Sequence, residues 1–169
     1  MSVFGNCTAQ LYSAPSSTQQ FSITFDALLI GHEAGITSLA WRPTSTEHSR
    51  DTLLSTSTDS SLILWSPSSQ SGSSSSFWTI QQRFGDVGGQ RLGGFVGGMW
   101  ITGGSEALAW GWSGGWRRWQ CAQIGGAATG DGVWTEVGAI TGHAGPVKDI
   151  AWSPGGEYLI SAGYVYVPF

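Results

Sequence analysis

The chain of 169 residues is long enough for one domain or for part of one. Glycine supplies 26 residues, about twice its usual share of roughly 7%, whereas charged residues make up only 11%, less than half of the usual roughly 25%. A formal net charge of −4 and a single lysine, Lys148, exclude proteins that bind nucleic acids through a basic surface and polybasic proteins of membrane surfaces. Ten tryptophans, seven phenylalanines and four tyrosines exclude a disordered chain.

Export signals, membrane spans and cofactor motifs are not predicted. The stretch MSVFGNCTAQLYSAPSS lacks the basic and apolar segments of a secretory signal, and no apolar run reaches the roughly 18 residues of a membrane helix. Two cysteines, Cys7 and Cys121, are too few for a disulfide framework. The cysteines and the three histidines lack metal-ligand spacing, and no glycine motif for phosphate is present, so we expect neither a metal nor another cofactor.

Short runs of β-branched and aromatic residues between Gly, Ser and Pro predict many short antiparallel strands and almost no helix. We expect a disordered or irregular N-terminus over 1–20, a surface loop at the low-complexity stretch 66–76, and close approach to neighbouring backbone by the glycine-rich stretch 85–104. The expected strands, in chain order, are 21–29, 36–41, 52–57, 61–65, 77–84, 94–101, 106–112, 116–122, 133–140, 146–152 and 157–162.

One segment of the sequence occurs twice. Residues 31–43 (GHEAGITSLAWRP) align without gaps with residues 142–154 (GHAGPVKDIAWSP), and LLSTS at 53–57 then corresponds to YLISAG at 158–163. The copies lie too far apart for one repeat unit of roughly 40–45 residues. We therefore expect a degenerate unit between them, built from the strands predicted from 94 to 140.

The first copy carries a set of polar residues at family-specific spacing. A Gly-His pair is followed by a serine, an aspartate four residues after it and a tryptophan six residues later, which resembles a blade of the WD-repeat β-propeller family, with Trp65-Ser66 in place of the usual Trp-Asp. The resemblance implies a structural tetrad in which the histidine bonds the serine, the aspartate sits in a turn and the tryptophan completes the chain. The residues at these places are His32, Ser55, Asp59 and Trp65.

The other units depart from this pattern. The second copy keeps His143 and Ser161 as a partial second tetrad, but Val165 stands where the aspartate is expected, and no tryptophan follows. In the middle unit Ala109 takes the serine place and Ser113 the aspartate place, six residues before a tryptophan. We also expect Trp41 and Trp152, which the repeat pairs, to lie in the core.

Longer stretches of the sequence resemble one particular group of WD-repeat proteins. FDALLIGHEAGITSLAW, LLSTSTDSSLILWSP, RFGDVGGQRLGGFVGGMW and GHAGPVKDIAWSPGGEYLISAG together resemble the WD-repeat (second) subunits of the Elongator complex over residues 21–163. The resemblance implies an all-β fold: a partial propeller of about two and a half four-stranded antiparallel blades. The expected division is an incomplete propeller at 21–163, with blades at 31–84 and 85–140, a partial blade at 141–163 and an off-pattern tail at 164–169.

The resemblance implies a non-catalytic scaffold. Elongator modifies the wobble uridine of tRNA with a 5-carboxymethyl-type group, and in that family this subunit holds the catalytic and large scaffold subunits together. No catalytic residue, cofactor, membrane contact or direct nucleic-acid contact is expected for this segment, and the expected location is the cytoplasm and nucleus. Because both sheet edges would be open, we expect a fragment or a shortened form.

Two alternatives remain beside the scaffold. One is a generic WD-repeat adaptor of another complex. The other is a serine hydrolase, because Gly111-Trp112-Ser113-Gly114-Gly115 matches G-x-S-x-G and Asp131 and His143 follow in triad order. A hydrolase, however, needs a helix after Ser113 and a parallel sheet with helices, which the sequence does not predict. Arg117 and Arg118 offer a site for base stacking, but an outer-strand position is favoured.

Overall fold

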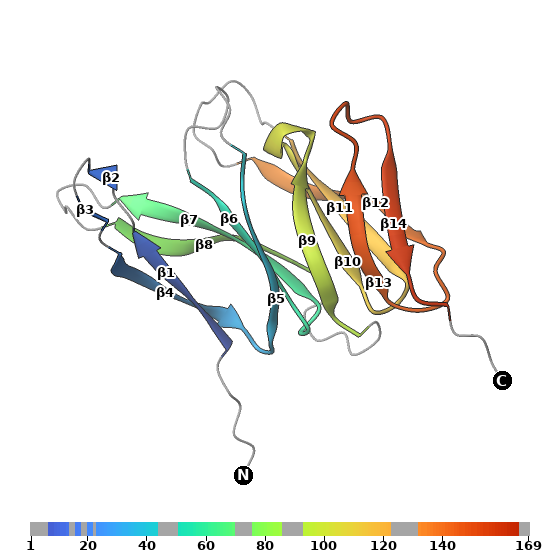
Figure 1. Ribbon diagram of the computed structural model, residues 1–169, viewed down its shortest axis with the longest axis horizontal. Coiled ribbons are helices and arrows are strands. Elements are labelled where there is room, and N and C mark those ends of the chain that lie inside the picture. The colour runs from blue at the N-terminus through green and yellow to red at the C-terminus, as the bar shows by residue number, and fades with distance from the viewer. Residues whose placement is uncertain are drawn as a thin grey trace, which may run out of the picture.

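The computed structural model describes residues 7–13, 16–17, 20–21, 23–43, 51–69, 76–85, 93–122 and 132–165. Strands dominate this part of the chain, and the one helical element in it is the 3-10 turn η1 (Thr102–Gly104). The sheets are antiparallel and lie side by side in chain order, from the N-terminal to the C-terminal end (Figure 1). This confirms the predicted all-β fold of antiparallel blades.

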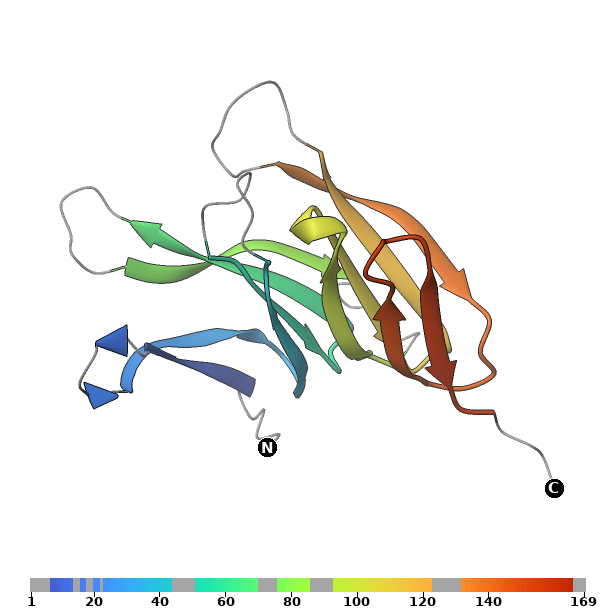
Figure 2. The same cartoon turned by 45° about the horizontal axis from the view of Figure 1, so that its top comes forward.

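Two of the sheets are complete four-stranded blades whose strands are paired in chain order. The first blade contains β5 (Ile36–Trp41), β6 (Leu53–Ser57), β7 (Ser61–Ser69) and β8 (Ser76–Gly85). The second contains β9 (Phe95–Ile101), β10 (Glu106–Gly111), β11 (Gly115–Ala122) and β12 (Val133–Thr141). Each strand pairs antiparallel with the next strand of the chain, so each blade is an antiparallel meander (Figure 2).

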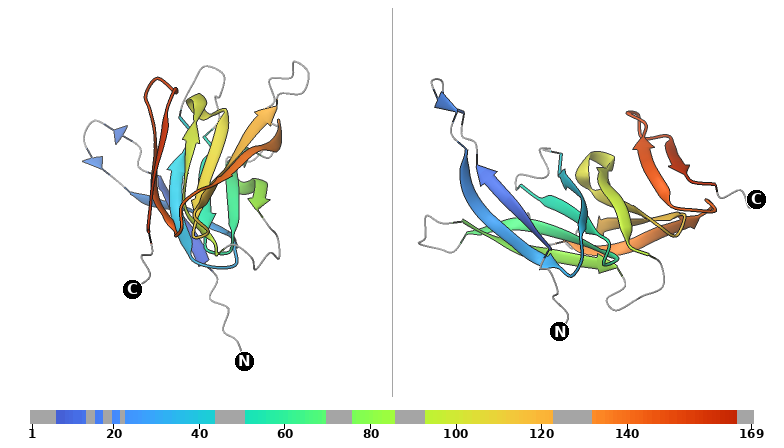
Figure 3. Two further views of the ribbon diagram at one scale, coloured as in Figure 1. Left: turned by 90° about the vertical axis from the view of Figure 1, so that its right-hand side faces the viewer. Right: turned by 60° about the horizontal axis from the view of Figure 1, so that its bottom comes forward.

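A two-stranded sheet lies at each end of this row of sheets (Figure 3). At the N-terminal side β1 (Cys7–Ser13) pairs with β4 (Thr24–His32), and at the C-terminal side β13 (Val147–Trp152) pairs with β14 (Leu159–Gly163). β2 (Ser16–Ser17) and β3 (Gln20–Phe21) form a small separate hairpin. The described part of the chain thus has two four-stranded blades and, at its two ends, two two-stranded sheets that we call half-blades.

The N-terminal half-blade differs from the expectation of an irregular segment over 1–20. Strand β1 lies inside that segment and pairs with β4 along its whole length. It was missed because its apolar side chains are few: Ala9 is buried and Leu11 partly buried, on the same side of the strand. This strand is stabilised by its pairing with β4, a contact that the sequence of β1 alone does not reveal. The predicted loop at 66–76 is shorter, because β7 continues to Ser69 and β8 begins at Ser76. The strand predicted at 94–101 is present as β9. Residues 70–75 and 86–92 lie outside the described residues.

A β-bulge marks the same position in each outer strand pair. The register shifts between Leu64 and Trp65 in the β7–β8 pair and between Arg118 and Trp119 in the β11–β12 pair. In the β1–β4 pair it shifts between Leu11 and Tyr12. Bulges are fixed features of related sheets. The β1–β4 sheet therefore corresponds to the third and fourth strands of a blade.

The first two blades meet along their innermost strands, β5 and β9. Ser38 Oγ donates to the Gly98 carbonyl at 3.2 Å and accepts the Gly98 N–H at 3.0 Å, and Trp100 Nε1 donates to the Ala40 carbonyl at 3.0 Å. A Cβ at Gly98 would lie 2.6 Å from Thr56 Cγ2. The close contact of the blades thus requires glycine at this position.

Arg42 closes the end of this junction. Its Nε donates to the Gly104 carbonyl at 2.7 Å, and its guanidinium carbon lies 5.2 Å from the ring centre of Trp100 and 5.9 Å from that of Trp134. Burial lowers the pKa of Arg42 from its usual value, yet a guanidinium stays charged at neutral pH. The contact therefore combines a charge-assisted hydrogen bond with cation–π attraction.

The largest buried cluster lies between the two complete blades and is mainly aromatic. Phe84 stacks on Trp119 with ring centres 5.5 Å apart, and Phe95 meets Trp119 edge-on at 6.1 Å. These geometries suit the quadrupoles of the rings. A second cluster lies between the second blade and β13–β14. The buried members of the first are Leu54, Leu62, Leu64, Phe84, Phe95, Trp100, Ala107, Ala109, Trp119 and Trp134, and those of the second are Ile101, Leu108, Trp110, Val147 and Ile150.

The predicted core position of Trp41 is wrong. Its side chain is 52% exposed and contacts Trp78 edge-on at 5.7 Å, while Trp152 is partly buried. Trp41 lies on the face of β5 directed away from the second blade, on the side of the N-terminal half-blade, which has only two strands. These two strands do not cover the Trp41 ring.

No helix in the described residues is long and apolar enough to cross a membrane.

Candidate functional site

The structure brings His32, Ser55, Asp59 and Trp65 together; we call them the His32 network. His32 ends β4, Ser55 lies in β6, Asp59 in the β6–β7 turn and Trp65 in β7. His32 Nε2 lies 2.7 Å from Ser55 Oγ, and His32 Nδ1 lies 3.2 Å from Asp59 Oδ2. Trp65 Nε1 donates to Ser55 Oγ at 2.9 Å. One network thus connects the half-blade strand β4 with three parts of the first complete blade.

The direction of the hydrogen bonds in this network can be assigned by starting from the Trp65 indole N–H. The Trp65 indole is only a donor, so the Ser55 oxygen accepts from it and the Ser55 O–H is free to donate to His32 Nε2. The imidazole then carries its proton on Nδ1 and donates it to the Asp59 carboxylate. Every group in this chain has a partner when His32 is neutral.

Asp59 is held by more groups than the sequence pattern implied. Its Oδ2 accepts the backbone N–H of Glu33 at 2.8 Å, and its Oδ1 accepts the backbone N–H of Ser61 at 2.8 Å. The Ser61 hydroxyl also bonds Oδ1 and lies 2.9 Å from His32 Nδ1, and the Arg83 guanidinium lies 3.7 Å from Oδ2. Sequence reasoning missed Ser61 and Arg83. A serine two residues after an aspartate in a turn was the available signal for Ser61.

Burial and these hydrogen bonds determine the charges of His32 and Asp59. Burial lowers the pKa of His32, and this outweighs the attraction of Asp59, which raises it. Burial alone would raise the pKa of Asp59, but the hydrogen bonds from Ser61 and from the Glu33 backbone hold it below its usual value. A neutral imidazole therefore donates to a charged carboxylate.

The other units contain only parts of this arrangement. His143 Nε2 lies 2.8 Å from Ser161 Oγ, so the structure joins the two residues of the partial second tetrad. Val165, at the aspartate place, is 72% exposed. In the second blade Ala109 and Trp119 lie in β10 and β11, where Ser55 and Trp65 lie in the first. Aromatic packing around Trp119 there replaces the polar network.

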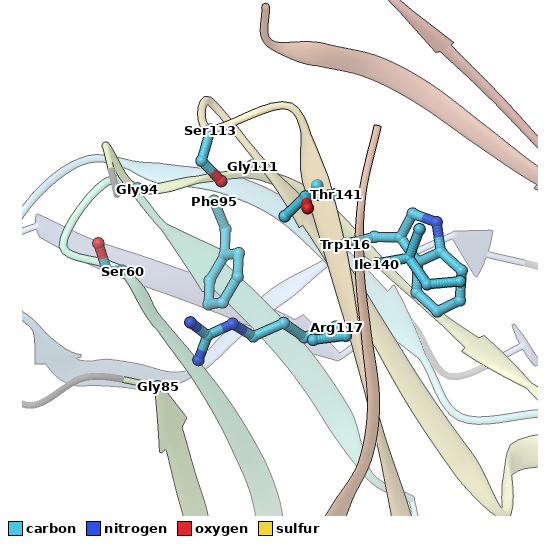
Figure 4. A pocket seen from close by; sticks show the side chains of 12 residues that line it. Ser60, Gly85, Gly94, Phe95, Gly111, Ser113, Trp116, Arg117, Ile140 and Thr141 are labelled. Carbon is cyan, nitrogen blue, oxygen red and sulfur yellow. The ribbon is translucent and has the colours of Figure 1, made fainter. Parts of the chain in front are cut away.

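The hydrolase arrangement is not formed. Ser113 lies in the tight turn between the antiparallel strands β10 and β11, so a strand follows it where a nucleophile elbow requires a helix. His143 is hydrogen-bonded to Ser161, and Asp131 lies outside the described residues. A shallow pocket borders Ser113, Phe95, Arg117 and Thr141 (Figure 4). Glycines and apolar groups form most of its remaining wall.

The two arginines of β11 face carboxylates. Arg117 NH1 lies 3.7 Å from Glu136 Oε2 and Arg118 Nε lies 3.3 Å from Glu106 Oε2. Both side chains are partly buried. Strand β11 is paired with β10 on one side and β12 on the other, so it is an interior strand and not the outer strand that was expected. No group of three His, Cys, Asp or Glu residues suited to a metal occurs among the residues that the structure describes.

Comparison with known protein families finds WD repeats in two segments of the chain. The WD domain, G-beta repeat family matches residues 23–66, which contain the His32 network, and residues 134–164, which contain the His143–Ser161 pair. These two segments are WD repeats. The matched WD repeats contain both Gly-His copies, whereas most of the second blade, which lacks this motif, lies between them.

The chain is also similar to part of much longer proteins. It is 36% identical over 149 residues to Elongator complex protein 2 of Schizosaccharomyces pombe, 34% over 151 residues to that of Saccharomyces cerevisiae and 32% over 147 residues to that of Homo sapiens. These alignments cover 83%, 82% and 85% of the chain and 17% of each relative. The chain thus spans about a sixth of the length of the curated relatives it matches.

Proposed function

We propose that the chain is a non-catalytic WD-repeat scaffold segment of the Elongator complex. In this role it supports wobble-uridine modification of tRNA by helping to hold the catalytic and large scaffold subunits together. It acts through protein–protein contacts in the cytoplasm and nucleus, and this segment makes no direct contact with nucleic acid.

The extent of the similarity carries this proposal. The alignment with Elongator complex protein 2 of Schizosaccharomyces pombe covers 83% of the chain, whereas the WD-repeat matches stop at residue 66 and resume at residue 134. A generic propeller would share mainly the repeat motif. Similarity across the intervening blade favours a specific relationship over a shared repeat pattern.

The His32 network supports a structural role for its residues. His32 is 5% exposed and Ser55 is fully buried, and their polar atoms bond one another. A catalytic group has to reach a substrate, whereas these groups are occupied with partners inside the blade. We therefore propose that His32, Ser55, Asp59 and Trp65 fix the loops of the first blade, and that His143 and Ser161 do so in part for the C-terminal half-blade.

A chimera tests the proposed function. The segment of the Schizosaccharomyces pombe relative that aligns with this chain is replaced by the chain itself, and the tagged chimera is purified from cells lacking the native subunit. We expect recovery of the other Elongator subunits and retention of wobble-uridine modification, measured by mass spectrometry of tRNA nucleosides. A matched chimera carrying an unrelated WD-repeat segment of equal length is expected to lose both.

Two outcomes contradict the proposal. If the chimera is as abundant as the native protein but recovers no Elongator subunit, the segment is not part of that scaffold. If it instead binds one other stable set of proteins in equimolar amounts, the adaptor alternative is favoured.

A further inference from the structure

The pocket beside Ser113 lies between the two four-stranded blades, and we call it the interblade pocket (Figure 4). The first blade contributes the β6–β7 turn at Ser60 and the end of β8 at Gly85. The second blade contributes Phe95 of β9, the β10–β11 turn and the adjoining ends of β11 and β12. Every lining residue thus belongs to a complete blade.

Polar groups of four side chains gather at this pocket. The Arg117 guanidinium and the hydroxyls of Ser113 and Thr141 lie around the Phe95 ring (Figure 4). Ser60 lines the wall that belongs to the first blade. The hydroxyls of Ser60, Ser113 and Thr141 have no hydrogen-bond partner in the part of the chain that the structure describes. These hydroxyls are therefore available to a ligand that accepts hydrogen bonds.

The turn that carries Ser113 is held in place at both of its ends. On one side the Trp112 N–H donates to the Gly94 carbonyl at 3.2 Å. On the other side the Gly114 carbonyl accepts the His143 N–H at 3.1 Å. The Ser113 hydroxyl is thus positioned before a ligand binds, and a preorganised site loses less free energy on binding.

Ser60 has a backbone conformation that favours glycine. Its φ angle is 67°, and Gly114, with a φ of 80°, occupies the equivalent place in the turn of the second blade. A serine in this left-handed region is strained, and such strain is more frequent at functional sites than elsewhere. The neighbouring Asp59 is fixed by the His32 network. The network therefore also positions one wall of the interblade pocket.

The size and charge of the interblade pocket suit a carboxylate. Its cavity volume of about 100 Å³ is several times the space that one water molecule requires, so a small polar group fits. Arg117 NH1 lies 3.7 Å from Glu136 Oε2. A guanidinium has five N–H donors, so it contacts Glu136 and a second carboxylate together. One guanidinium shared in this way does not balance the nearly two negative charges of a phosphate ester.

The shallow shape of the pocket favours an acid that is attached to a larger molecule. Sites for free small molecules usually bury most of the ligand surface, which a shallow pocket does not do. Trp112, in the same turn as Ser113, is 50% exposed. Tryptophan is enriched among the residues that dominate binding at protein interfaces. An acidic side chain on a protein surface gains affinity from this ring as well as from the pocket.

We propose that the interblade pocket binds the carboxylate of an aspartate or glutamate side chain of a partner protein. Arg117, Ser113 and Thr141 donate hydrogen bonds to the carboxylate, and Trp112 contacts an apolar residue beside the acid. Charge-assisted hydrogen bonds of this kind are stronger than those between neutral groups. The proposal rests on the contact between the two blades and not on the Elongator role, and its test uses no Elongator subunit.

Three acetylated and amidated tripeptides test the proposal. They have the sequence Leu-Asp-Leu, the same sequence with asparagine at the centre, and the same sequence with phosphoserine there. Each is titrated into the ¹⁵N-labelled 169-residue chain, and NMR follows the arginine Nε–Hε signals and the backbone signals of the β10–β11 turn. We expect saturable shifts with the aspartate peptide and roughly tenfold weaker binding of the asparagine peptide, because the charge-assisted bonds are lost.

Three outcomes of these titrations contradict the proposal. Shifts that do not saturate with the aspartate peptide would mean that the pocket does not bind acidic side chains. Equal affinity for the aspartate and asparagine peptides would remove the role of the charge. Tighter binding of the phosphoserine peptide than of the aspartate peptide would overturn the assignment of a carboxylate.

Substitutions locate the binding in the pocket. Arg117→Gln is expected to weaken binding of the aspartate peptide roughly tenfold. Arg118→Gln is the matched control, because Arg118 follows in β11 on the opposite face of the sheet and also faces a carboxylate, that of Glu106. It is expected to bind as the wild type does. Circular dichroism checks folding, and Thr141→Val, at an exposed position, gives a second pocket variant with weaker binding. Wild-type affinity in folded Arg117→Gln, or equal losses in the two arginine variants, would refute the proposal.

Discussion

At the scale of single residues, the Ser55 hydroxyl connects the two ends of the His32 network. It accepts the Trp65 indole N–H at 2.9 Å and lies 2.7 Å from His32 Nε2, and it is fully buried. Its loss leaves two buried polar groups without a partner at once. The blade therefore depends more on this small side chain than its size suggests.

Ser55→Ala is expected to lower the free energy of unfolding by about 1–3 kcal/mol, because buried groups lose their partner. Urea unfolding followed by circular dichroism measures the change. Ser105→Ala is the matched control, since its exposed hydroxyl bonds only the Thr102 carbonyl; its effect is expected to stay within about 0.5 kcal/mol. Equal effects of the two substitutions would contradict the network's role.

Stability is expected to fall as the pH drops below about 6.5, the usual pKa of histidine. Burial lowers the pKa of His32 in the folded chain, so the unfolded chain takes up this proton first, and acid favours unfolding until the pH passes the folded pKa. Asp59, with its lowered pKa, adds a loss below its usual pKa of 3.8. Unfolding midpoints at pH 7.5 and 5.5 measure the effect of His32. His32→Gln is expected to show a smaller difference between the two; an unchanged difference would assign the pH dependence to other groups.

The sequence was sufficient to predict the four residues of the network but not the residues that hold Asp59. Their spacing is specific to WD repeats, so His32, Ser55, Asp59 and Trp65 could be found from a single sequence. Ser61 and Arg83 were missed, because their contacts depend on the turn and on the pairing of β7 with β8. Local spacing predicts local geometry, whereas contacts across strands need the register.

At the scale of elements, the junction of β5 with β9 depends on close backbone approach. Ser38 bonds both backbone groups of Gly98, and Thr56 and Leu54 fill the space beside that glycine. The glycine-rich stretch 85–104 was expected to lie close to neighbouring backbone, and its strand β9 does so. Strand β1 was missed, in contrast, because its pairing with β4 is not visible in its own short sequence.

Gly98→Ala is expected to destabilise the chain by about 1–3 kcal/mol, as overpacking in a tight core does. A Cβ there would lie 2.6 Å from Thr56 Cγ2 and 3.0 Å from Leu54 Cδ2, so the blades must separate. Gly138→Ala in β12 is the control, because a Cβ at that position meets nothing within 4 Å. Thermal unfolding compares the two. A loss for Gly138→Ala as large as that for Gly98→Ala would show that the contact between blades is not the cause.

At the scale of the whole molecule, the repeat predicted the order of the blades but not which faces are covered. Trp41 and Trp152 occupy equivalent repeat positions, yet Trp41 is half exposed because only two strands stand beside it. Burial of a propeller strand depends on the neighbouring blade. A single sequence therefore predicts the strand and leaves its burial to the number of neighbouring strands.

Phe84 belongs to the first blade and Phe95 and Trp119 to the second, so the aromatic cluster holds the two blades together. The first blade also has hydrogen bonds around Ser55. Hydrophobic attraction weakens on cooling. Near the freezing point of water the contact between the two blades is therefore expected to weaken, whereas the hydrogen bonds of Ser55 still connect β4, β6 and β7.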